Sequence, residues 1–208
     1  MEEMAMIRTA VLVSGNGARL QCVLDSMYFG ELPDFELTAV IMTEANPYAL
    51  RRAKNANVPA YVVETSDFPT KLSYSMAIAN KLRDMDIDLV VLAGYDMPLG
   101  VVATQFKSRI IGVYPSLIPA FEGNENPVRA ALERGCKLTG ATAYFANIDG
   151  GIGAIIAQHP VSVKQGDDVE SLSTRIMEEA EWKLLPKAIG LYCGGKLEIH
   201  GERVVIKE

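Results

Sequence analysis

The chain has 208 residues, 49% of them apolar, and 20 basic against 26 acidic side chains give a net charge of −6 at neutral pH. This length favours one domain that buries a sizeable core without a metal or disulfide staple. The acidic balance argues against a general nucleic-acid or membrane-surface binder, and no apolar run approaches the roughly 18 residues of a membrane span.

Cysteine usage and the start of the chain indicate the compartment. Residues 1–8 are acidic and lack a signal-peptide pattern. Cys22, Cys136 and Cys193 form no CxxC pair and leave an odd count. These features predict free, buried or spectator thiols in a reducing cytoplasm.

Short apolar runs alternate with helical patterns over the first 115 residues or so. Strands are predicted at residues 9–14, 37–42, 60–63 and 88–94, and helices at 18–28, from about Pro47, and at about 69–85. The last helix carries Leu72, Met76, Ala79 and Leu82 at helical spacing, which predicts one buried face. The alternation predicts an α/β, Rossmann-like fold with a mostly parallel sheet flanked by helices.

The second half adds fewer elements. Strands are predicted at residues 110–114 and 141–145, helices at about 127–134 and 169–192, and a terminal hairpin at 197–199 and 204–206. No repeat, low-complexity tract or linker interrupts the chain. Residues 1–208 are therefore expected to form a single domain with a C-terminal helix and hairpin.

The first candidate site is the turn between the first strand and the first helix. It comprises Gly15, Asn16, Gly17, Ala18 and Arg19. Its glycines permit a sharp turn, and the N–H groups of the helix start favour an anion such as phosphate. It is not the GxGxxG fingerprint, because position 20 is leucine. A tight turn with a solvated arginine is the alternative interpretation.

The second candidate follows the strongest predicted strand. It comprises Tyr95, Asp96, Met97, Pro98 and Leu99. In open parallel sheets this edge forms ligand crevices, and aromatic and apolar residues there suit a flat ring system. The alternative is an ordinary loop whose apolar residues cap the core.

Two further loops are rigid or rich in glycine. Residues 112–123 contain two prolines and a closing glycine, which predicts an irregular site wall or simply a stiff connection. Residues 147–153 form a Gly-rich turn whose one titratable residue is Asp149, and plain turn chemistry explains it equally. His159 and His200 fall outside all four loops, and no triad or metal-ligand spacing is visible.

Taken together and in this order, the loops resemble the phosphoribosylglycinamide formyltransferase family, the folate-dependent enzymes of purine synthesis. The resemblance rests on Val13-Ser14-Gly15-Asn16-Gly17, Val91-Leu92-Ala93-Gly94-Tyr95, Pro115-Ser116-Leu117-Ile118-Pro119-Ala120-Phe121-Glu122-Gly123, Thr139-Gly140-Ala141-Thr142 and Glu181-Trp182-Lys183-Leu184-Leu185-Pro186. It covers nearly the whole chain. Methionyl-tRNA formyltransferase shares the Pro-Ser-Leu-x-Pro signature but carries a further C-terminal domain, for which we expect no room here.

The resemblance implies a reaction and shows where this chain departs from it. In the family, the primary amine of glycinamide ribonucleotide takes the formyl group of 10-formyltetrahydrofolate through a tetrahedral oxyanion. An Asn and a His stabilise that charge, and an Asp orients the His. Here Gly112, Tyr114 and Gly151 stand at those three positions, and Tyr144 replaces a further histidine. No catalytic residue is therefore retained, and Tyr114 and Asp149 are the available substitutes.

This chain keeps more of the family's ligand-binding positions than of its catalytic positions. The resemblance assigns substrate phosphate to Gly15, Asn16, Gly17, Ala18 and Arg19, although Ala18-Arg19 replaces the family's Ser-Asn, and substrate contact to Glu181. It assigns folate to Tyr95, Asp96, Met97, Pro98, Leu99, Ala146 and Asn147, with Asp96 as an unusual carboxylate. Folate binding is expected to be weak, because burying that carboxylate unpaired would be costly.

Two functional hypotheses follow. The first is a formyltransferase of impaired or altered activity, with 10-formyltetrahydrofolate as co-substrate and no metal. The second is a non-catalytic paralogue that binds a phosphoribosyl or folate ligand or a protein partner. In both, we expect a small phosphorylated ligand, no nucleic acid or membrane partner, and a monomer or homodimer.

Overall fold

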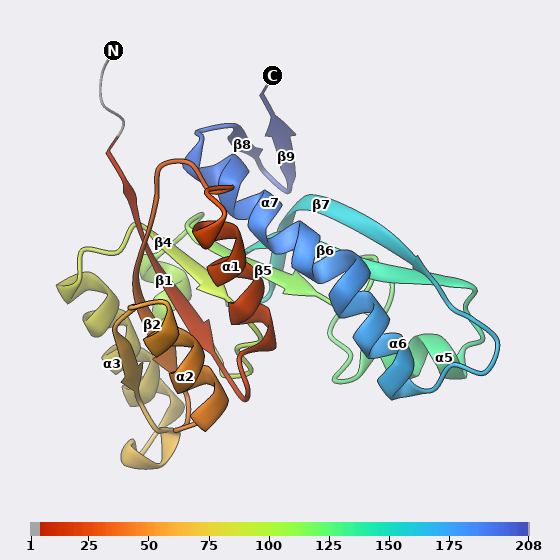
Figure 1. Cartoon of the computed structure of the whole chain (residues 1–208), viewed down its shortest axis with the longest axis horizontal. Helices are drawn as coiled ribbons and strands as arrows, with labels where there is room; N and C mark the ends of the chain where they lie inside the picture. Colours follow the sequence, from red (N-terminus) through yellow and green to blue (C-terminus); the bar gives the residue numbers. More distant parts are fainter. Residues whose placement is uncertain (1–4, 208) are drawn as a thin grey trace.

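The computed structural model describes residues 5–207, whose strands form one sheet in the order β3-β2-β1-β4-β5-β6-β7-β9-β8 (Figure 1). The strands are β1 (Ile7–Val13), β2 (Phe35–Met42), β3 (Ala60–Val62), β4 (Leu89–Leu92), β5 (Ile110–Tyr114), β6 (Leu138–Ala146), β7 (Ile152–Ser162), β8 (Leu197–His200) and β9 (Arg203–Ile206). Strands β1 to β5 pair in parallel, whereas β6 pairs antiparallel with both β5 and β7. The predicted α/β class with a mostly parallel sheet is confirmed.

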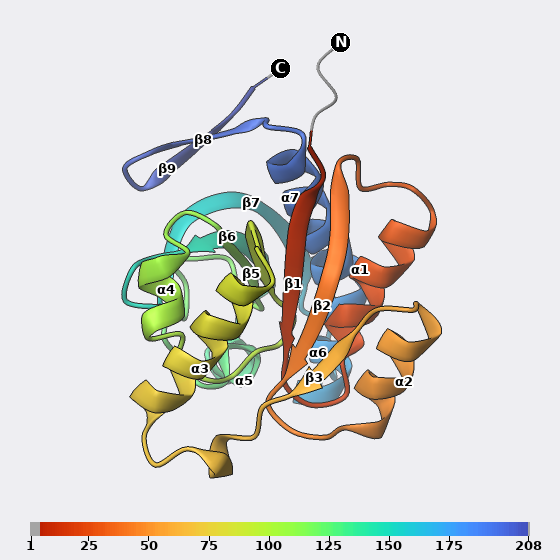
Figure 2. The ribbon, with the colours of Figure 1, turned by 90° about the vertical axis from the view of Figure 1, so that its left-hand side faces the viewer.

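Helices cover both faces of the sheet. They are α1 (Ala18–Tyr28), α2 (Pro47–Asn55), α3 (Lys71–Asp84), α4 (Val101–Gln105), α5 (Pro127–Glu133), α6 (Val169–Ile176) and α7 (Trp182–Cys193). Figure 2 shows α1, α2 and α7 on one side of β1 and β2, and α3 and α4 on the other. Each face has its own apolar core, and α4 was not predicted. Among residues 5–207, no helix combines the length and apolar character that crossing a membrane requires.

The predicted buried face of α3 is wrong in part. Leu72 and Met76 are 60% and 48% exposed, whereas Tyr74, Ile78 and Leu82 are buried. A capping box of Thr70 and Ser73 begins the helix. The Tyr74 ring packs edge-on against Phe68, with centroids 5.5 Å apart. Residues 74, 78 and 82 pack in the same apolar cluster as residues of the sheet.

The long C-terminal helix predicted at residues 169–192 contains a π-helical turn. Helix α6 ends at Ile176, the π turn covers Met177–Glu181, and α7 follows directly. A π turn inserts extra backbone and so changes which side chains face inward. It leaves Glu181 buried against the carboxyl end of the sheet.

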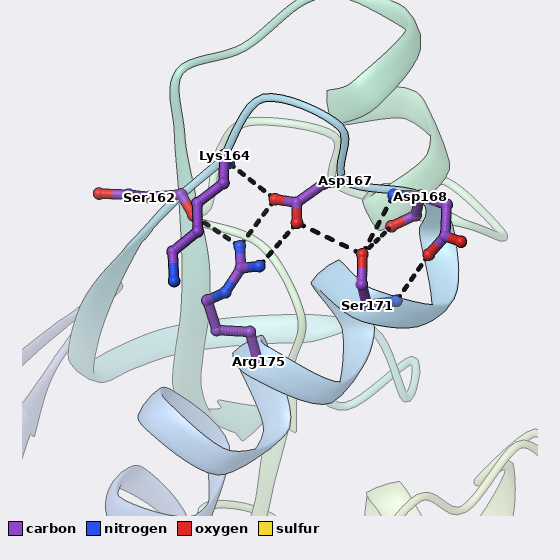
Figure 3. Close-up of polar contacts among 6 residues, drawn as sticks. All are labelled: Ser162, Lys164, Asp167, Asp168, Ser171 and Arg175. Atoms are coloured by element: carbon purple, nitrogen blue, oxygen red, sulfur yellow. Dashed lines mark hydrogen bonds and ion pairs between the residues drawn. The ribbon is translucent and has the colours of Figure 1, made fainter.

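A polar clamp fixes the start of α6 (Figure 3). The guanidinium of Arg175 donates to both carboxylate oxygens of Asp167, at 2.7 and 2.6 Å, and to the Ser162 carbonyl at 3.1 Å. The Lys164 N–H also donates to Asp167, at 2.7 Å. The hydrogen bonds from Arg175 hold the pKa of Asp167 well below its usual range. The clamp ties β7 to α6 and so supports the segment that carries Glu181.

The predicted C-terminal hairpin and the predicted free cysteines are both present in the structure. Strands β8 and β9 form the expected hairpin, which joins the sheet through the parallel pair Ile155 and Arg203. All three cysteines are free thiols; Cys22 and Cys193 are buried and Cys136 is half-buried.

Candidate functional site

The site lies where the order of the strands reverses. The chain runs outward from β1 through β2 to β3, and then returns to place β4 and β5 on the other side of β1. Ligand crevices in open α/β sheets form at such a switch point, outside the carboxyl ends of the strands. The structure brings two predicted loops together there, because the Ser14 hydroxyl after β1 donates to the Asp96 carboxylate after β4.

The predicted phosphate turn is a tight glycine turn that leads directly into α1. Gly17 is the N-cap of α1 with φ of 71°, and a Cβ there would lie 3.2 Å from the Cβ of Ala49. The positive φ therefore favours glycine, and a side chain here would also press against Ala49. The Asn16 side chain accepts the Ala18 N–H at 3.0 Å, and Arg52 donates to the Asn16 carbonyl at 3.3 Å.

Arg19 does not extend freely into solvent and makes its side-chain hydrogen bonds outside its own loop. Its Nε and Nη2 donate to the two carboxylate oxygens of Glu181, each at 2.8 Å. The Glu181 side chain is 1% exposed and that of Arg19 is 30% exposed. Burial disfavours the charged guanidinium, but the charge and hydrogen bonds of Glu181 outweigh it and raise the pKa of Arg19. Two residues assigned separate ligand contacts thus form one ion pair.

The position of the family's asparagine is closed by a neighbouring ring. Gly112 on β5 pairs with Leu92 of β4 and with Tyr144 of β6. A Cβ on Gly112 would lie 2.9 Å from both Cζ and Oη of Tyr144, which is closer than real Cβ contacts. Burial raises the pKa of Tyr144 to about 12. The glycine and the tyrosine are therefore coupled, since the ring fills the space that a side chain at 112 would occupy.

Tyr114 is the first residue that could substitute for the family's catalytic side chains, and its hydroxyl is hydrogen-bonded within its own loop. Its hydroxyl lies 2.8 Å from the Phe121 carbonyl oxygen and 2.9 Å from that of Asn124. A phenol has one proton to donate, so this contact commits it to closing the loop. Burial raises the pKa of Tyr114 and keeps it in the neutral form.

Asp149 is the second possible substitute, and its carboxylate is likewise hydrogen-bonded within its own turn. Its Oδ1 accepts the Gly151 N–H at 2.9 Å, and Asn147 Oδ1 accepts the same N–H at 2.8 Å. The turn itself packs on the second candidate loop, because a Cβ on Gly150 would lie 3.2 Å from the Cβ of Leu99. The loops after β4 and β6 are thus neighbours, as the resemblance implies.

The predicted folate residues are divided between two hollows. Asp96 and Met97 line one of about 520 Å³ together with Ser14, Glu44 and Glu64. Ala146 and Asn147 line another of about 500 Å³, between the β6–β7 hairpin and the C-terminal hairpin. Leu99 is buried in the core, as the alternative for this loop proposed.

Asp96 has a hydrogen-bond donor beside it, and the cost of burying it under a folate stays a prediction. The side chain is exposed, and it accepts the Ser14 hydroxyl. Nearby, the hydroxyls of Tyr74 and Tyr95 are buried next to each other, and burial raises both of their pKa values. Residues 5–207 contain no group of three or more His, Cys, Asp or Glu placed to hold a metal ion.

Sequence reasoning missed three contacts that define the site: Ser14 with Asp96, Arg19 with Glu181, and Gly112 with Tyr144. The first has a usable signal, since both residues end neighbouring strands in the predicted sheet. The second joins residues 162 positions apart in the chain. The third depends on the register between β5 and β6.

Comparison with known proteins matches this geometry to one family. Residues 7–189 match the family model described as formyl transferase. The phosphoribosylglycinamide formyltransferase of Haemophilus influenzae is 34% identical over 195 residues, which cover 93% of this chain and 91% of that protein. The human trifunctional purine biosynthetic protein adenosine-3 is also 34% identical, and the match covers 97% of this chain but 20% of that protein.

Solved structures agree. Glycinamide ribonucleotide transformylase 1 from Symbiobacterium toebii has a TM-score of 0.92 and 40% identity, covering 98% of this chain and 95% of that one. The phosphoribosylglycinamide formyltransferase of Coxiella burnetii, in complex with CHES, has a TM-score of 0.87 and 28% identity, covering 96% of this chain and 93% of that one.

Proposed function

Because the chain belongs to the formyl transferase family, we propose that it is a phosphoribosylglycinamide formyltransferase-like protein of purine biosynthesis whose formyl transfer is severely slowed. Its framework is that of the relatives, with the same fold over nearly the whole chain. The single observation that carries the impairment is the packing of Tyr144 against Gly112, whose ring end occupies the space that the family's asparagine would need.

The chemistry explains why this packing matters. Attack of the amine on the formyl carbon places a negative charge on the formyl oxygen, and donors must already point at that charge. Gly112 has no side chain, and its strand is internal between β4 and β6. The Tyr114 proton faces loop carbonyls, and Gly151 supplies no carboxylate. Loss of one oxyanion donor costs about 10²–10³ in rate, although such losses are not additive.

We propose that the protein keeps more of the family's affinity for ligands than of its rate of formyl transfer. The backbone N–H groups at the start of α1 are proposed to hold a phosphate, with 10-formyltetrahydrofolate as the co-substrate and no metal. Folate binding is proposed to be weak, because three carboxylates line the hollow beside Met97, at Asp96, Glu44 and Glu64. Folate carries carboxylates of its own, and like charges repel. A cytoplasmic monomer or homodimer fits this role.

A non-catalytic paralogue is the second candidate function. The ion pair of Arg19 and Glu181 favours it, because each oxygen of the carboxylate assigned to substrate already accepts a hydrogen bond from Arg19. In that role the protein binds a phosphoribosyl or folate ligand, or a protein partner, without turnover.

Two measurements test the proposal. Calorimetry with glycinamide ribonucleotide and with a folate, done separately, measures binding, and a steady-state assay with both substrates measures turnover. We expect binding of the ribonucleotide with little or no formyl transfer. A kcat within about tenfold of 10 s⁻¹, a typical enzyme value, overturns the proposed impairment. Binding of neither ligand favours the protein-partner role.

A further inference from the structure

The sheet of residues 5–207 ends at β8 with an edge that no other strand covers. In Figure 2 the hairpin of β8 and β9 lies beyond β7, at one end of the molecule. The opposite edge is β3, which has three residues and directly follows Pro59, a residue type that protects edges against pairing with another chain. Strand β8 contains no proline, so its edge can accept a further strand.

The hydrogen bonds of the hairpin show which backbone groups of β8 face this edge. The Lys207 N–H donates to the Lys196 carbonyl at 2.8 Å, so Lys196 and every second residue after it direct their backbone groups toward β9. Leu197 and Ile199 alternate with these positions and direct their N–H and C=O groups to the free edge. The Ile199 side chain is also 37% exposed. Ile199 is therefore the middle of an edge that is ready to pair.

The charges of this segment have opposite signs on the two sides of Ile199. Glu198 and His200 flank it, and Lys196 and Glu202 lie three residues away on either side. When two copies pair about a two-fold axis at Ile199, their strands run antiparallel, and residues equally distant from Ile199 face each other. Lys196 then faces the partner's Glu202. Glu198 faces the partner's His200, whose imidazole N–H can donate to the carboxylate.

The two neighbouring registers of the same pairing oppose like charges. An axis at Glu198 places the Glu198 carboxylates of both copies opposite each other. An axis at His200 places Glu198 opposite the partner's Glu202. Like charges directly opposite destabilise an antiparallel pair, whereas opposite charges stabilise it. Among these three registers, the one centred on Ile199 is the self-complementary one.

An apolar face adds to the edge. Leu197 pairs with Ile206 and Ile199 with Val204 across the hairpin, so these four side chains lie on one face. Ile206 is 45% exposed. A two-fold axis perpendicular to the sheet puts this face on the same side in both copies and brings the two Ile199 side chains together. Pairing therefore removes apolar surface from water as well as forming backbone hydrogen bonds.

We propose that the free edge of β8 is the surface at which two copies of this chain associate, antiparallel and about a two-fold axis at Ile199. The edge is short, so the contact is smaller than the roughly 1,200 Å² of a standard interface, and the dimer is weak and reversible. The inference goes beyond the proposed function, because it does not depend on which ligand the crevice binds or on the rate of formyl transfer. Its test measures mass, so it can fail while the proposed function stands.

Sedimentation equilibrium of the full chain, from about 10 μM to about 1 mM, measures the association. We expect a monomer–dimer equilibrium with a Kd below about 1 mM. We expect no larger species, because the two-fold pairing uses the β8 edge of both copies. A monomer at every concentration in this range overturns the inference.

A proline variant tests the edge itself. Ile199→Pro removes an N–H that faces the free edge and that the hairpin does not use, so the hairpin tolerates it. It is expected to weaken the dimer at least tenfold, with an unchanged circular dichroism spectrum. The control Val205→Thr removes apolar surface from β9, where Val205 is 48% exposed, and is expected to stay within threefold. Equal losses in the two variants, or no loss in Ile199→Pro, overturn the inference.

Charge reversals test the register, and they decide the matter alone if Ile199→Pro does not fold. Lys196 and Glu202 form no ion pair with any residue in 5–207, so their reversal breaks no such pair within the chain. Lys196→Glu and Glu202→Lys are each expected to weaken the dimer at least fivefold, because like charges then face each other twice.

Mixed in equal amounts, the two charge-reversal variants are expected to associate within threefold of the unmodified protein, because each supplies the charge that the other lacks. Full affinity of both single variants, or a mixture that stays as weak as its components, overturns the inference.

Discussion

Two regions of the same crevice have changed in different ways. At the start of α1, the turn that we propose binds an anion is shaped by its backbone, and Gly17 keeps a positive φ although the neighbouring side chains differ from the family pattern. On β5 and β6, the resemblance places the family's asparagine and a further histidine, which are side chains. Here Gly112 and Tyr144 stand at those two positions and pack against each other. A site built from backbone N–H groups tolerates substitution, whereas an oxyanion site built from side chains does not.

The largest expected effect comes from rebuilding the β5–β6 region. The variant Gly112→Asn/Tyr114→His/Tyr144→His/Gly151→Asp should raise formyl transfer at least about 10³-fold, because it restores the donor, the imidazole and the carboxylate together. The matched control keeps Tyr144 and changes the other three residues. It should gain little activity and lose about 1–3 kcal/mol of stability from overpacking.

Steady-state kinetics and urea unfolding check both variants. If the control with Tyr144 retained is as active and as stable as the full set, the coupling between residues 112 and 144 is wrong. If neither gains activity, the impairment lies outside these positions.

The next largest effect is on stability and concerns the ion pair that joins the two regions. Arg19→Gln should lower the free energy of unfolding by about 3–5 kcal/mol, because it leaves Glu181 charged and unpaired in a buried place. The control is Lys207→Gln, whose partner Glu198 is 46% exposed and whose own side chain is 51% exposed. It should cost no more than about 1 kcal/mol. Equal losses by urea unfolding would contradict the buried character of the Arg19 pair.

A smaller, pH-dependent effect is expected at the clamp that supports Glu181 from outside the site. Arg175 lowers the pKa of Asp167 in the folded protein, so folding favours the charged form. This contribution is complete above the unfolded pKa of about 3.9 and is lost as the pH falls through the lower folded value.

Asp167→Asn should therefore be less stable than the unchanged protein at pH 6, and the difference should shrink steadily below pH 4. Thermal unfolding between pH 6 and 2 measures this. Asp84→Asn, at an exposed carboxylate 3.9 Å from Arg83, is the control and should show no such convergence. A constant difference at every pH would mean that the amide introduced by Asp167→Asn disturbs packing and that charge is not the cause.

The same distinction between backbone and side chain explains what the sequence could reveal. Helix α1 was predicted at its observed bounds, because its apolar period and the preceding glycines are local signals. The π turn that directs Glu181 inward has no comparable local signal. The exposure of Leu72 depends on how Tyr74 packs against Phe68, and the closure of Gly112 depends on strand register. Turns and the periodicity of apolar residues can be predicted from the sequence, but side-chain contacts between distant elements cannot.

The smallest effect should appear at the start of α1, where we propose that backbone N–H groups bind the phosphate. Ala18→Ser restores a family residue beside the turn, and it should leave the affinity for inorganic phosphate within threefold, since the N–H groups are unchanged. Gly17→Ala is the matched contrast. It adds one methyl group at φ of 71°, 3.2 Å from Ala49, and should weaken phosphate at least tenfold by distorting the turn. Calorimetry on folded samples of both variants decides between backbone and side chain: a large gain from Ala18→Ser, with Gly17→Ala unaffected, would show that side chains hold the anion here too.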